Sequence, residues 1–591
     1  MSKLEKSLSI CFIVMCTWKT VFAQVDSLDM KQAFPDSMDQ LLEQASPVED
    51  SPLPDLLSQE SDGGILQPQL TIRSRIQQTL QKAAGYEKGT YHGSMVKSYH
   101  RIRVRGGDHL SAGILFEKDA GEKRFNDFTA GNLTITGIGP ARKVILGDFI
   151  VEAGEGMALW RGYDLSKGAD IISPVQRKER GLVPYLSSDE QNYLSGIAAE
   201  FEAGKNSTDI FYSLRSLSAS IDSNNHVSGF YTAGYFRTDA EEGKRDDLQE
   251  RMIGVRNTFH FDKQRIGFTA YKTVFSSGLV LEGERRFEGK EYSLAALDFA
   301  FDWFPVGLFG EWAFVNRTMG GISGLVLQPS PVMNLIASLR HYPANLVSLH
   351  GLGFGEKFPN EDGLYVGVHI HPRGMSLTLY YDQYRFPEPI PGLHFPSTGS
   401  DLFLQLEFIP ASLFNVQLRC QRKVSGVRGF EAVDENGLPL LRVETQRTRR
   451  IRLDLEYAPS QQARLRTRFE RAYFDQSSRQ EKGLMIYQDI ALKPTAQLRW
   501  DFRLVFFQSD SYDSRIYETE KELSGLLALP ALYGRGIRWY ARLTYQLLEQ
   551  FEFSAKYSDL LRDDVKRIGS GLDELPGNHD NRIGVQFDLR F

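Results

Sequence analysis

Residues that could carry out chemistry are scattered along this 591-residue chain rather than gathered into a motif. His369 and His371 stand two positions apart, so both would lie on one face of a strand, where two histidines can contribute to a metal site. The sequence specifies no third ligand, and the alternative is an ordinary polar position on the strand. His394 is a lone histidine without an assignable partner. We therefore expect no metal ion and no cofactor.

A hydrolytic centre would need a nucleophile, a base and a group that orients the base. No G-x-S-x-G sequence is present, and no GK[ST] sequence follows the glycines Gly154 and Gly156. We assign no catalytic residues and expect a protein that is not an enzyme.

Arginine shows the clearest pattern among the polar residues of the last third of the chain. In "RIRLDLEY" (450–457) charged residues alternate with apolar ones, so the two kinds face opposite sides of a strand. Two interpretations stay open: a basic strip that favours anionic solutes, or pairing with acidic residues on neighbouring strands. The arginines are Arg450, Arg452, Arg464, Arg466, Arg468, Arg499, Arg503, Arg538 and Arg542, and the acids are Asp454, Glu456, Glu470, Asp501 and Asp588.

The same alternation recurs along most of the chain and predicts an all-β fold. Segments of about 9 to 13 residues, such as "QLRWDFRLVFF" (497–507), match the length of tilted membrane-spanning strands, and roughly 24–26 of them can be counted. One face carries full charges and the other carries large apolar residues. Because a closed barrel pairs every backbone group in lipid, we expect a large antiparallel transmembrane β-barrel. Its short turns would face the periplasm and its long loops the outside.

The first part of the chain differs from the rest. Residues 1–23 read as a signal peptide, with a basic start and a short apolar core. The alternative, a lipoprotein acylated at Cys16, lacks the small residues expected before such a cysteine. Residues 24–85 are expected to be an acidic periplasmic leader, partly disordered, with short helices that include "TIRSRIQQTLQKAAGY" (71–86). The barrel is then expected over 86–591.

The chain ends on the strand-like sequence "RIGVQFDLRF", whose last residue is aromatic. We expect this strand to close the barrel against the first one, with Phe591 in an aromatic girdle at the lipid boundary. A final strand of this kind also resembles the signal read by the barrel-assembly machinery, and the residues concerned are Phe587, Leu589 and Phe591.

Residues 155–191 form an unusually long connection between two predicted strands. Long loops are often functional, and this one mixes apolar and charged groups. It is either an ordinary external loop or a plug that fills a wide barrel and contacts the charged strips of the wall. We expect the second, with four candidate residues: Trp160, Arg177, Lys178 and Arg180.

Several blocks of the sequence resemble one known family. They include "LGDFIVEAGEGMALWRGYDLSKGADI", "PYLSSDEQNYLSGIA", "LHFPSTGSDLFLQLEFIP" and "YGRGIRWY", and they span nearly all of residues 70–591 in the family's order. The chain resembles the Bacteroidota-type outer-membrane barrels named for helix-hairpin-helix, or ComEA-like, domains. The resemblance implies an outer-membrane barrel. DNA binding does not transfer, because no helix-hairpin-helix repeat, with two helices joined by a Gly-containing turn, is visible between leader and barrel.

We therefore expect a protein of the outer membrane of a Gram-negative bacterium, embedded in lipid and inserted by the barrel-assembly machinery. The leading hypothesis is a channel or transport-related pore for an unidentified solute. The alternatives are a plugged barrel that serves as an assembly or binding platform, with an unidentified periplasmic or outer-membrane partner, and DNA uptake, which only the family name suggests. The net charge of −6 makes nucleic acid an improbable partner.

Overall fold

The computed structural model describes residues 68–160, 167–281, 287–429, 432–433, 439–440 and 442–591. The expected signal peptide and most of the expected leader lie outside the described residues. Among the described residues, no helix is long and apolar enough to cross a membrane.

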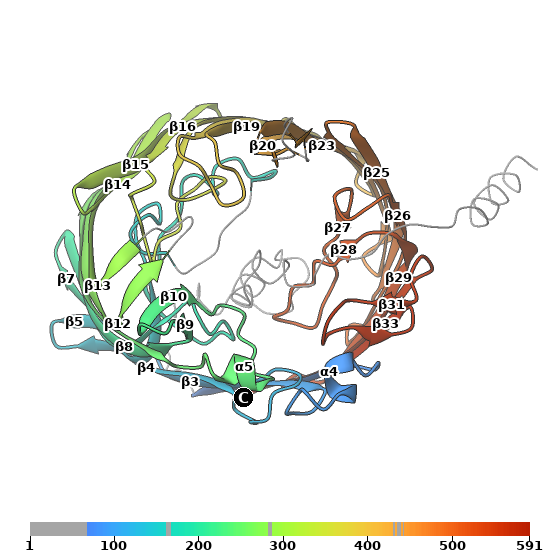
Figure 1. The fold of residues 1–591 in the computed structure, drawn as a ribbon, viewed down its shortest axis with the longest axis horizontal. Helices are drawn as coiled ribbons and strands as arrows, with labels where there is room; N and C mark the ends of the chain where they lie inside the picture. The colour runs from blue at the N-terminus through green and yellow to red at the C-terminus, as the bar shows by residue number, and fades with distance from the viewer. Residues whose placement is uncertain (1–67, 161–166, 282–286, 430–431, 434–438, 441) are drawn as a thin grey trace, which may run out of the picture.

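Twenty-four antiparallel strands form a closed barrel, in agreement with the sequence prediction. Figure 1 shows the wall as a ring seen end-on. The strands are β1 (Gln69–Thr79), β2 (Val96–Gly106), β3 (Leu110–Lys118), β4 (Phe128–Ile138), β5 (Ala141–Glu152), β7 (Leu194–Ala203), β8 (Asn206–Leu217), β11 (Leu248–Phe261), β12 (Gln264–Leu281), β13 (Phe287–Trp303), β14 (Val306–Val315), β15 (Thr318–Ser330), β16 (Met333–Tyr342), β17 (Glu361–Ile370), β18 (Met375–Phe386), β19 (Ser397–Ala411), β20 (Phe414–Arg428), β23 (Val443–Ser460), β24 (Ala463–Gln476), β25 (Arg479–Leu492), β26 (Leu498–Ser509), β29 (Arg535–Leu548), β30 (Phe551–Arg562) and β33 (His579–Arg590).

The connections between the wall strands contain the remaining short elements. These are the helices α4 (Ala84–Glu87) and α5 (Asp239–Glu242), the strands β6 (Gly181–Pro184), β9 (Ala219–Ile221) and β10 (His226–Phe230), and three two-residue pairs: β21 (Ala432–Val433) with β22 (Pro439–Leu440), β27 (Ile516–Tyr517) with β28 (Ala531–Leu532), and β31 (Arg567–Ile568) with β32 (Leu575–Pro576).

The barrel closes between β33 and β1. The two strands pair in antiparallel register from Thr71 opposite Arg590 to Thr79 opposite Arg582. Leu70 N–H donates to Phe591 O at 2.9 Å, and Phe591 N–H donates to Leu70 O at 2.8 Å. The final residue therefore completes the ladder, as the sequence predicted.

The position of the first strand corrects two predictions. Residues 71–86 were expected to be helical, and the barrel was expected to begin at residue 86. Instead, β1 begins at Gln69 and pairs with β2 on one side and β33 on the other. The segment is rich in helix-forming glutamine and arginine, but pairing on both edges outweighs this local preference.

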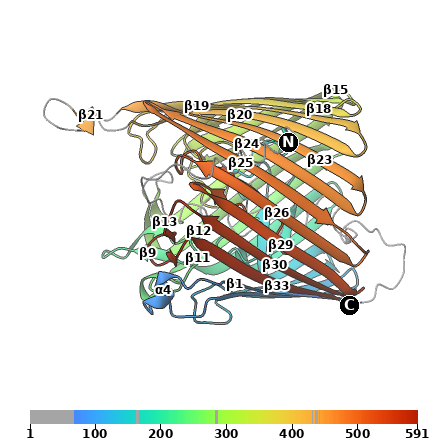
Figure 2. The same cartoon turned by 90° about the vertical axis from the view of Figure 1, so that its right-hand side faces the viewer.

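Short and long connections lie at opposite ends of the barrel. Turns such as 107–109, 262–263 and 412–413 share one end with the C-terminus, whereas 153–193, 343–360 and 510–534 belong to the other. Figure 2 shows the C-terminus at one end of the inclined strands and α4 at the opposite end. This separation agrees with the turns and loops distinguished in the sequence.

The wall has an apolar outer face and a charged inner face. On β26, Trp500, Phe502 and Phe506 are exposed, whereas the alternating Asp501 and Arg503 are buried. The outer residues face lipid and the inner residues face the lumen, as expected for a transmembrane barrel.

Candidate functional site in the barrel lumen

The described parts of the connection between β5 and β7, residues 153–160 and 167–193, fold into the lumen. The N–H groups of Met157 and Ala158 each donate to a carboxylate oxygen of Glu311 on β14 at 2.9 Å. Tyr365 on β17 donates to the carbonyl of Ile171 at 3.2 Å. A Cβ at Gly367 would lie only 3.1 Å from the Ile171 Cβ. Because Gly367 is close to the short-turn end of β17, the connection extends far into the barrel.

A second connection, residues 343–360, packs with the first. Trp160 N–H donates to the carbonyl of His350 at 3.0 Å, and the Ser348 hydroxyl donates to the carbonyl of Met157 at 2.8 Å. We call residues 153–160, 167–193 and 343–360 together the plug. Apolar side chains join it to the wall, and this buried cluster includes Met157, Leu159, Ile171, Val175, Leu346, Tyr271, Phe309 and Tyr365.

Charged groups of the plug pair with acids and bases of the wall. Lys167 lies 2.5 Å from both Glu356, in the plug, and Asp382, on β18. Burial alone would raise the pKa of Glu356, but Lys167 and Lys423 hold this pKa at about 2. Burial raises the pKa of Glu155 to about 8, and neighbouring Glu311 acts in the same direction. The plug therefore contains both paired carboxylates and a buried carboxyl whose pKa is raised by its surroundings.

The four candidate residues of this connection lie in different surroundings. Trp160 and Arg177 are buried, and the Arg177 guanidinium stacks 4.7 Å from the centre of the Trp160 ring. Arg180 donates to Glu152 on β5 at 2.7 Å. Lys178 is exposed. Three of the four residues thus contribute to the plug, and Lys178 does not pack into it.

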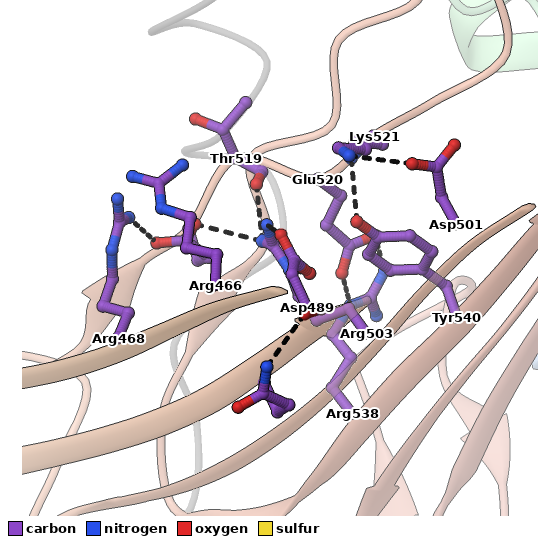
Figure 3. Close-up of polar contacts among 12 residues, drawn as sticks. Arg466, Arg468, Asp489, Asp501, Arg503, Thr519, Glu520, Lys521, Arg538 and Tyr540 are labelled. Atoms are coloured by element: carbon purple, nitrogen blue, oxygen red, sulfur yellow. Dashed lines mark hydrogen bonds and ion pairs between the residues drawn. The ribbon is translucent and has the colours of Figure 1, made fainter. Parts of the chain in front are cut away.

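A third connection, residues 510–534, lies against the opposite part of the wall, and we call it the acidic segment. Glu518 lies 2.5 Å from Arg468 and 3.0 Å from Arg503. Lys521 lies 2.7 Å from Asp501, near the short-turn end of β26. Figure 3 shows part of this network, with labels on Arg466, Arg468, Asp489, Asp501, Arg503, Thr519, Glu520, Lys521, Arg538 and Tyr540.

Glu520 of the acidic segment also pairs with two cations of the wall. It bonds to Arg538 on β29 and lies 3.1 Å from Lys556 on β30. Burial alone would raise its pKa, but the two cations hold this pKa at about 2. A small apolar cluster that includes Ile516 and Leu532 completes the attachment. The plug also has ion pairs to the wall, such as those of Glu179 with Arg256 and of Glu356 with Lys423, so the two attachments differ mainly in the size of the apolar cluster.

Most of the nine candidate arginines are paired with acids, which favours the second of the two interpretations made from sequence. Their partners lie on neighbouring strands, in the acidic segment or, for Arg499, on the same strand. The pairs are Arg452–Glu470, Arg464–Glu456, Arg466–Asp454, Arg468–Asp454, Arg499–Asp501, Arg503–Asp489, Arg538–Glu520 and Arg542–Asp501.

Arg450 differs from the other eight candidates. Within the described part of the chain it has no ion pair, and nearby Arg419 on β20 bonds only to the neutral Gln405. Arg419 stands directly opposite Arg452 in the β20–β23 ladder. This stretch of the inner wall keeps an excess of positive charge.

The prediction that residues 155–191 contact the arginine strip was wrong. The contacts of this connection include β4, β8, β14 and β18, whereas the acidic segment contacts the arginines. Sequence reasoning missed Glu518, Glu520 and Glu522, although the run "YETEKE" (517–522) places acids in a long loop beside basic strands. The complementary charges of this acidic run and of the basic strands are the sequence signal that could have predicted the contact.

The two strand histidines show no sign of a metal site. The rings of His369 and His371 lie 5.0 Å apart, and His369 Nδ1 bonds to the Thr378 hydroxyl at 2.9 Å. Among the described residues, no three histidine, cysteine or acidic side chains are grouped so that they could hold a metal ion.

A closed 24-strand barrel with an apolar outer face and a charged lumen defines an outer-membrane β-barrel protein. No family model and no curated protein matches the chain. The family resemblance drawn from the sequence therefore stays a prediction.

Solved outer-membrane proteins share the general architecture. The siderophore receptor PirA from Acinetobacter baumannii is 10% identical, with a TM-score of 0.42 over 89% of this chain and 80% of that one. The ferric enterobactin receptor PfeA in complex with BCV-L6 is 9% identical, with a TM-score of 0.43 over 89% and 81%. OmpT of Vibrio cholerae is 11% identical, with a TM-score of 0.27 over 56% and 99%. Structural similarity at this level does not indicate the function of this chain.

Proposed function

We propose that this protein is a gated channel through which small polar solutes cross the outer membrane. The observation that carries the proposal is the difference between the two attachments inside the lumen. The plug is joined to the wall by ion pairs and by an extensive apolar cluster, whereas the acidic segment is joined by ion pairs and only a small apolar cluster. Ion pairs exchange their partners more readily with water and salt than an apolar core does. The acidic segment is the gate in this proposal.

The charge of the inner wall suggests which solutes would pass. When the acidic segment moves away, Arg468, Arg503 and Arg538 lose some of their carboxylate partners. Together with Arg419 and Arg450 they would leave an excess of positive charge on the inner face of β20–β29. Rings and strips of arginine favour anions in pores. We therefore propose that anionic solutes are preferred.

Conductance across planar lipid bilayers tests the gate. We expect the double variant Glu518→Gln/Glu520→Gln to open more often than the wild type, because it removes the charges that hold the acidic segment. The control is Asp513→Asn, which changes an acid of the same segment that pairs with half-exposed Arg479 at 2.8 Å. The open state should be anion-selective, and Arg450→Glu should reduce that selectivity.

Absence of conductance would contradict the proposal. If neither the wild type, the double variant nor a variant with residues 511–533 replaced by a short Gly-Ser linker conducts, the gate is refuted. If replacing residues 155–191 as well still gives no conductance, the channel itself is refuted.

The apolar cluster of the plug favours one alternative. Its extent suits a barrel that stays permanently plugged and serves as an assembly or binding platform. Crosslinking in intact outer membranes followed by purification distinguishes the two functions, because a platform should recover a defined partner in stable proportion.

A further inference from the structure

Six exposed cations gather on the outside of the barrel, and we call them the outer basic patch. They lie on four neighbouring strands, β20 and β23–β25, in the halves nearer the long loops. Each shares its strand face with lipid-facing residues such as Leu418, Ile451, Phe469 and Leu484. The six are Arg422, Arg428, Arg447, Arg449, Arg471 and Lys482.

The strand register brings these cations close together. Arg422 stands directly opposite Arg449 in the β20–β23 ladder. Tyr473 lies beside Arg449, and the guanidinium groups of Arg449 and Arg471 lie 5.4 Å and 5.3 Å from the centre of its ring. Directly opposed residues have Cα atoms only about 4.5–5.5 Å apart, and like charges at such positions are unfavourable. The arrangement is therefore costly unless an anion lies between the cations.

The protein itself supplies little of the negative charge required. Asp475 on β24 lies 2.8 Å from Arg449. In the described part of the chain, the other five cations of the patch have no ion pair. Some exposed cations elsewhere on the outer wall have an acidic partner: Lys272 lies 2.6 Å from Glu291, and Arg385 lies 2.8 Å from Asp362. The patch differs from these sites because its six cations lie together and have, in the part of the chain that the structure describes, one ion pair.

The height of the patch indicates where its anion comes from. On β23 the next outward residue toward the short-turn end after Arg449 is the exposed Ile451, and on β24 Phe469 follows Arg471 in the same direction. From there on the outer face of these strands is apolar apart from Thr467 and Gln488, which bond to each other at 2.6 Å. The cations therefore lie at the upper boundary of the lipid-facing belt, in the headgroup layer of the leaflet on the long-loop side.

We propose that the outer basic patch binds the phosphorylated headgroup of a lipid in that leaflet. Arginine binds phosphate oxygens in a bidentate manner, and three arginines that converge on one point can share one headgroup. A lipid suits the site better than a free anion, because its acyl chains can lie on Ile451, Phe469 and Leu484 directly below the patch. The site is on the outer wall, and it is independent of any passage through the lumen.

Native mass spectrometry of the purified full chain tests the proposal. The protein in neutral detergent is titrated with diphosphorylated lipid A, and separately with phosphatidylcholine as the zwitterionic comparison. The test variant is Arg422→Gln/Arg449→Gln/Arg471→Gln. The control variant is Arg251→Gln/Lys272→Gln/Arg385→Gln, which removes three exposed cations from other parts of the outer wall. Migration on unheated SDS gels checks that each variant is folded.

Wild type and control should bind lipid A and prefer it to phosphatidylcholine. The test variant should bind on the order of 100-fold more weakly, because each cation near an anionic membrane surface contributes roughly a fivefold increase in affinity. Equal binding by folded test and control variants would refute the site. Displacement of lipid A by an equal concentration of inorganic phosphate would also refute it, because the acyl chains would then contribute nothing.

Discussion

The same residue type has three different roles in this barrel, and its surroundings decide which. Arg503 is buried in the inner wall, where it bonds to Asp489 at 2.6 Å and to the carbonyl of Thr519 at 2.7 Å. Arg450 faces the lumen without a carboxylate partner among the described residues. Arg449, the preceding residue of β23, is exposed on the outer wall in the outer basic patch. Alternation along one strand thus places neighbouring arginines in different media.

Replacing Arg503 by alanine should strongly destabilise the protein. The variant leaves Asp489 and Glu518 buried without their shared cation, and breaking a buried pair of this kind costs about 3–5 kcal/mol. Urea unfolding in lipid vesicles, followed by tryptophan fluorescence, measures the loss of free energy. Arg464→Ala is the matched control, because the Arg464 side chain is 42% exposed and lies 3.5 Å from Glu456. An exposed pair contributes at most about 1 kcal/mol, so similar losses in both variants would contradict the assigned roles.

At the scale of elements, β1 shows what closure of a barrel requires. Ser74 faces outward and pairs with His100 of β2 and with Phe587 of β33. Proline in place of Ser74 should sharply reduce the yield of folded barrel, because it removes an N–H from a strand paired on both edges. Valine at the same position keeps the ladder and should fold. The fraction of heat-modifiable protein on unheated SDS gels measures both, and a normal yield of Ser74→Pro would mean that β1 is dispensable.

The strands that the sequence revealed and the one it missed differ in their outer face. On β26 every outward residue up to Phe506 is apolar, so the period of two is unmistakable. On β1 the inward residues are Arg73, Arg75 and Gln77, but Ser74 interrupts the outward row and weakens the alternation. The pattern predicts a strand where lipid contact is continuous. It fails where one polar residue breaks the row and the local composition favours a helix.

The lumen was less predictable than the wall for a related reason. Length and mixed composition indicated that residues 155–191 could fill a wide barrel, and the plug includes most of them. No periodicity governs such a segment, because its contacts are made with many strands rather than with one sheet face. Its partners Glu311 and Asp382 lie far away in the sequence, so only the assembled ring brings them together. Charge complementarity is the one sequence signal that reaches across such distances.

At the scale of the whole molecule, the two ends of the barrel and its interior should react differently with a membrane-impermeant maleimide. The test begins from Cys420→Ser, because Cys420 is the one free cysteine in the described part of the chain. Single cysteines then replace Ser223, exposed in the turn between β9 and β10, Ser412 in the short turn between β19 and β20, and Ser187 in the plug, whose exposed fraction is 0%.

On intact cells Ser223→Cys should react rapidly, because long loops face the outside. Ser412→Cys should react only after the outer membrane is permeabilised, because the short turns face the periplasm. Ser187→Cys should stay slow under both conditions, since burial in the plug shields it from either side. Rapid reaction of Ser412→Cys on intact cells would mean that the short turns face the outside, so the barrel would have the opposite orientation. Rapid reaction of Ser187→Cys would mean that the plug leaves the lumen in the cell. The plug would then be a second gate in addition to the acidic segment.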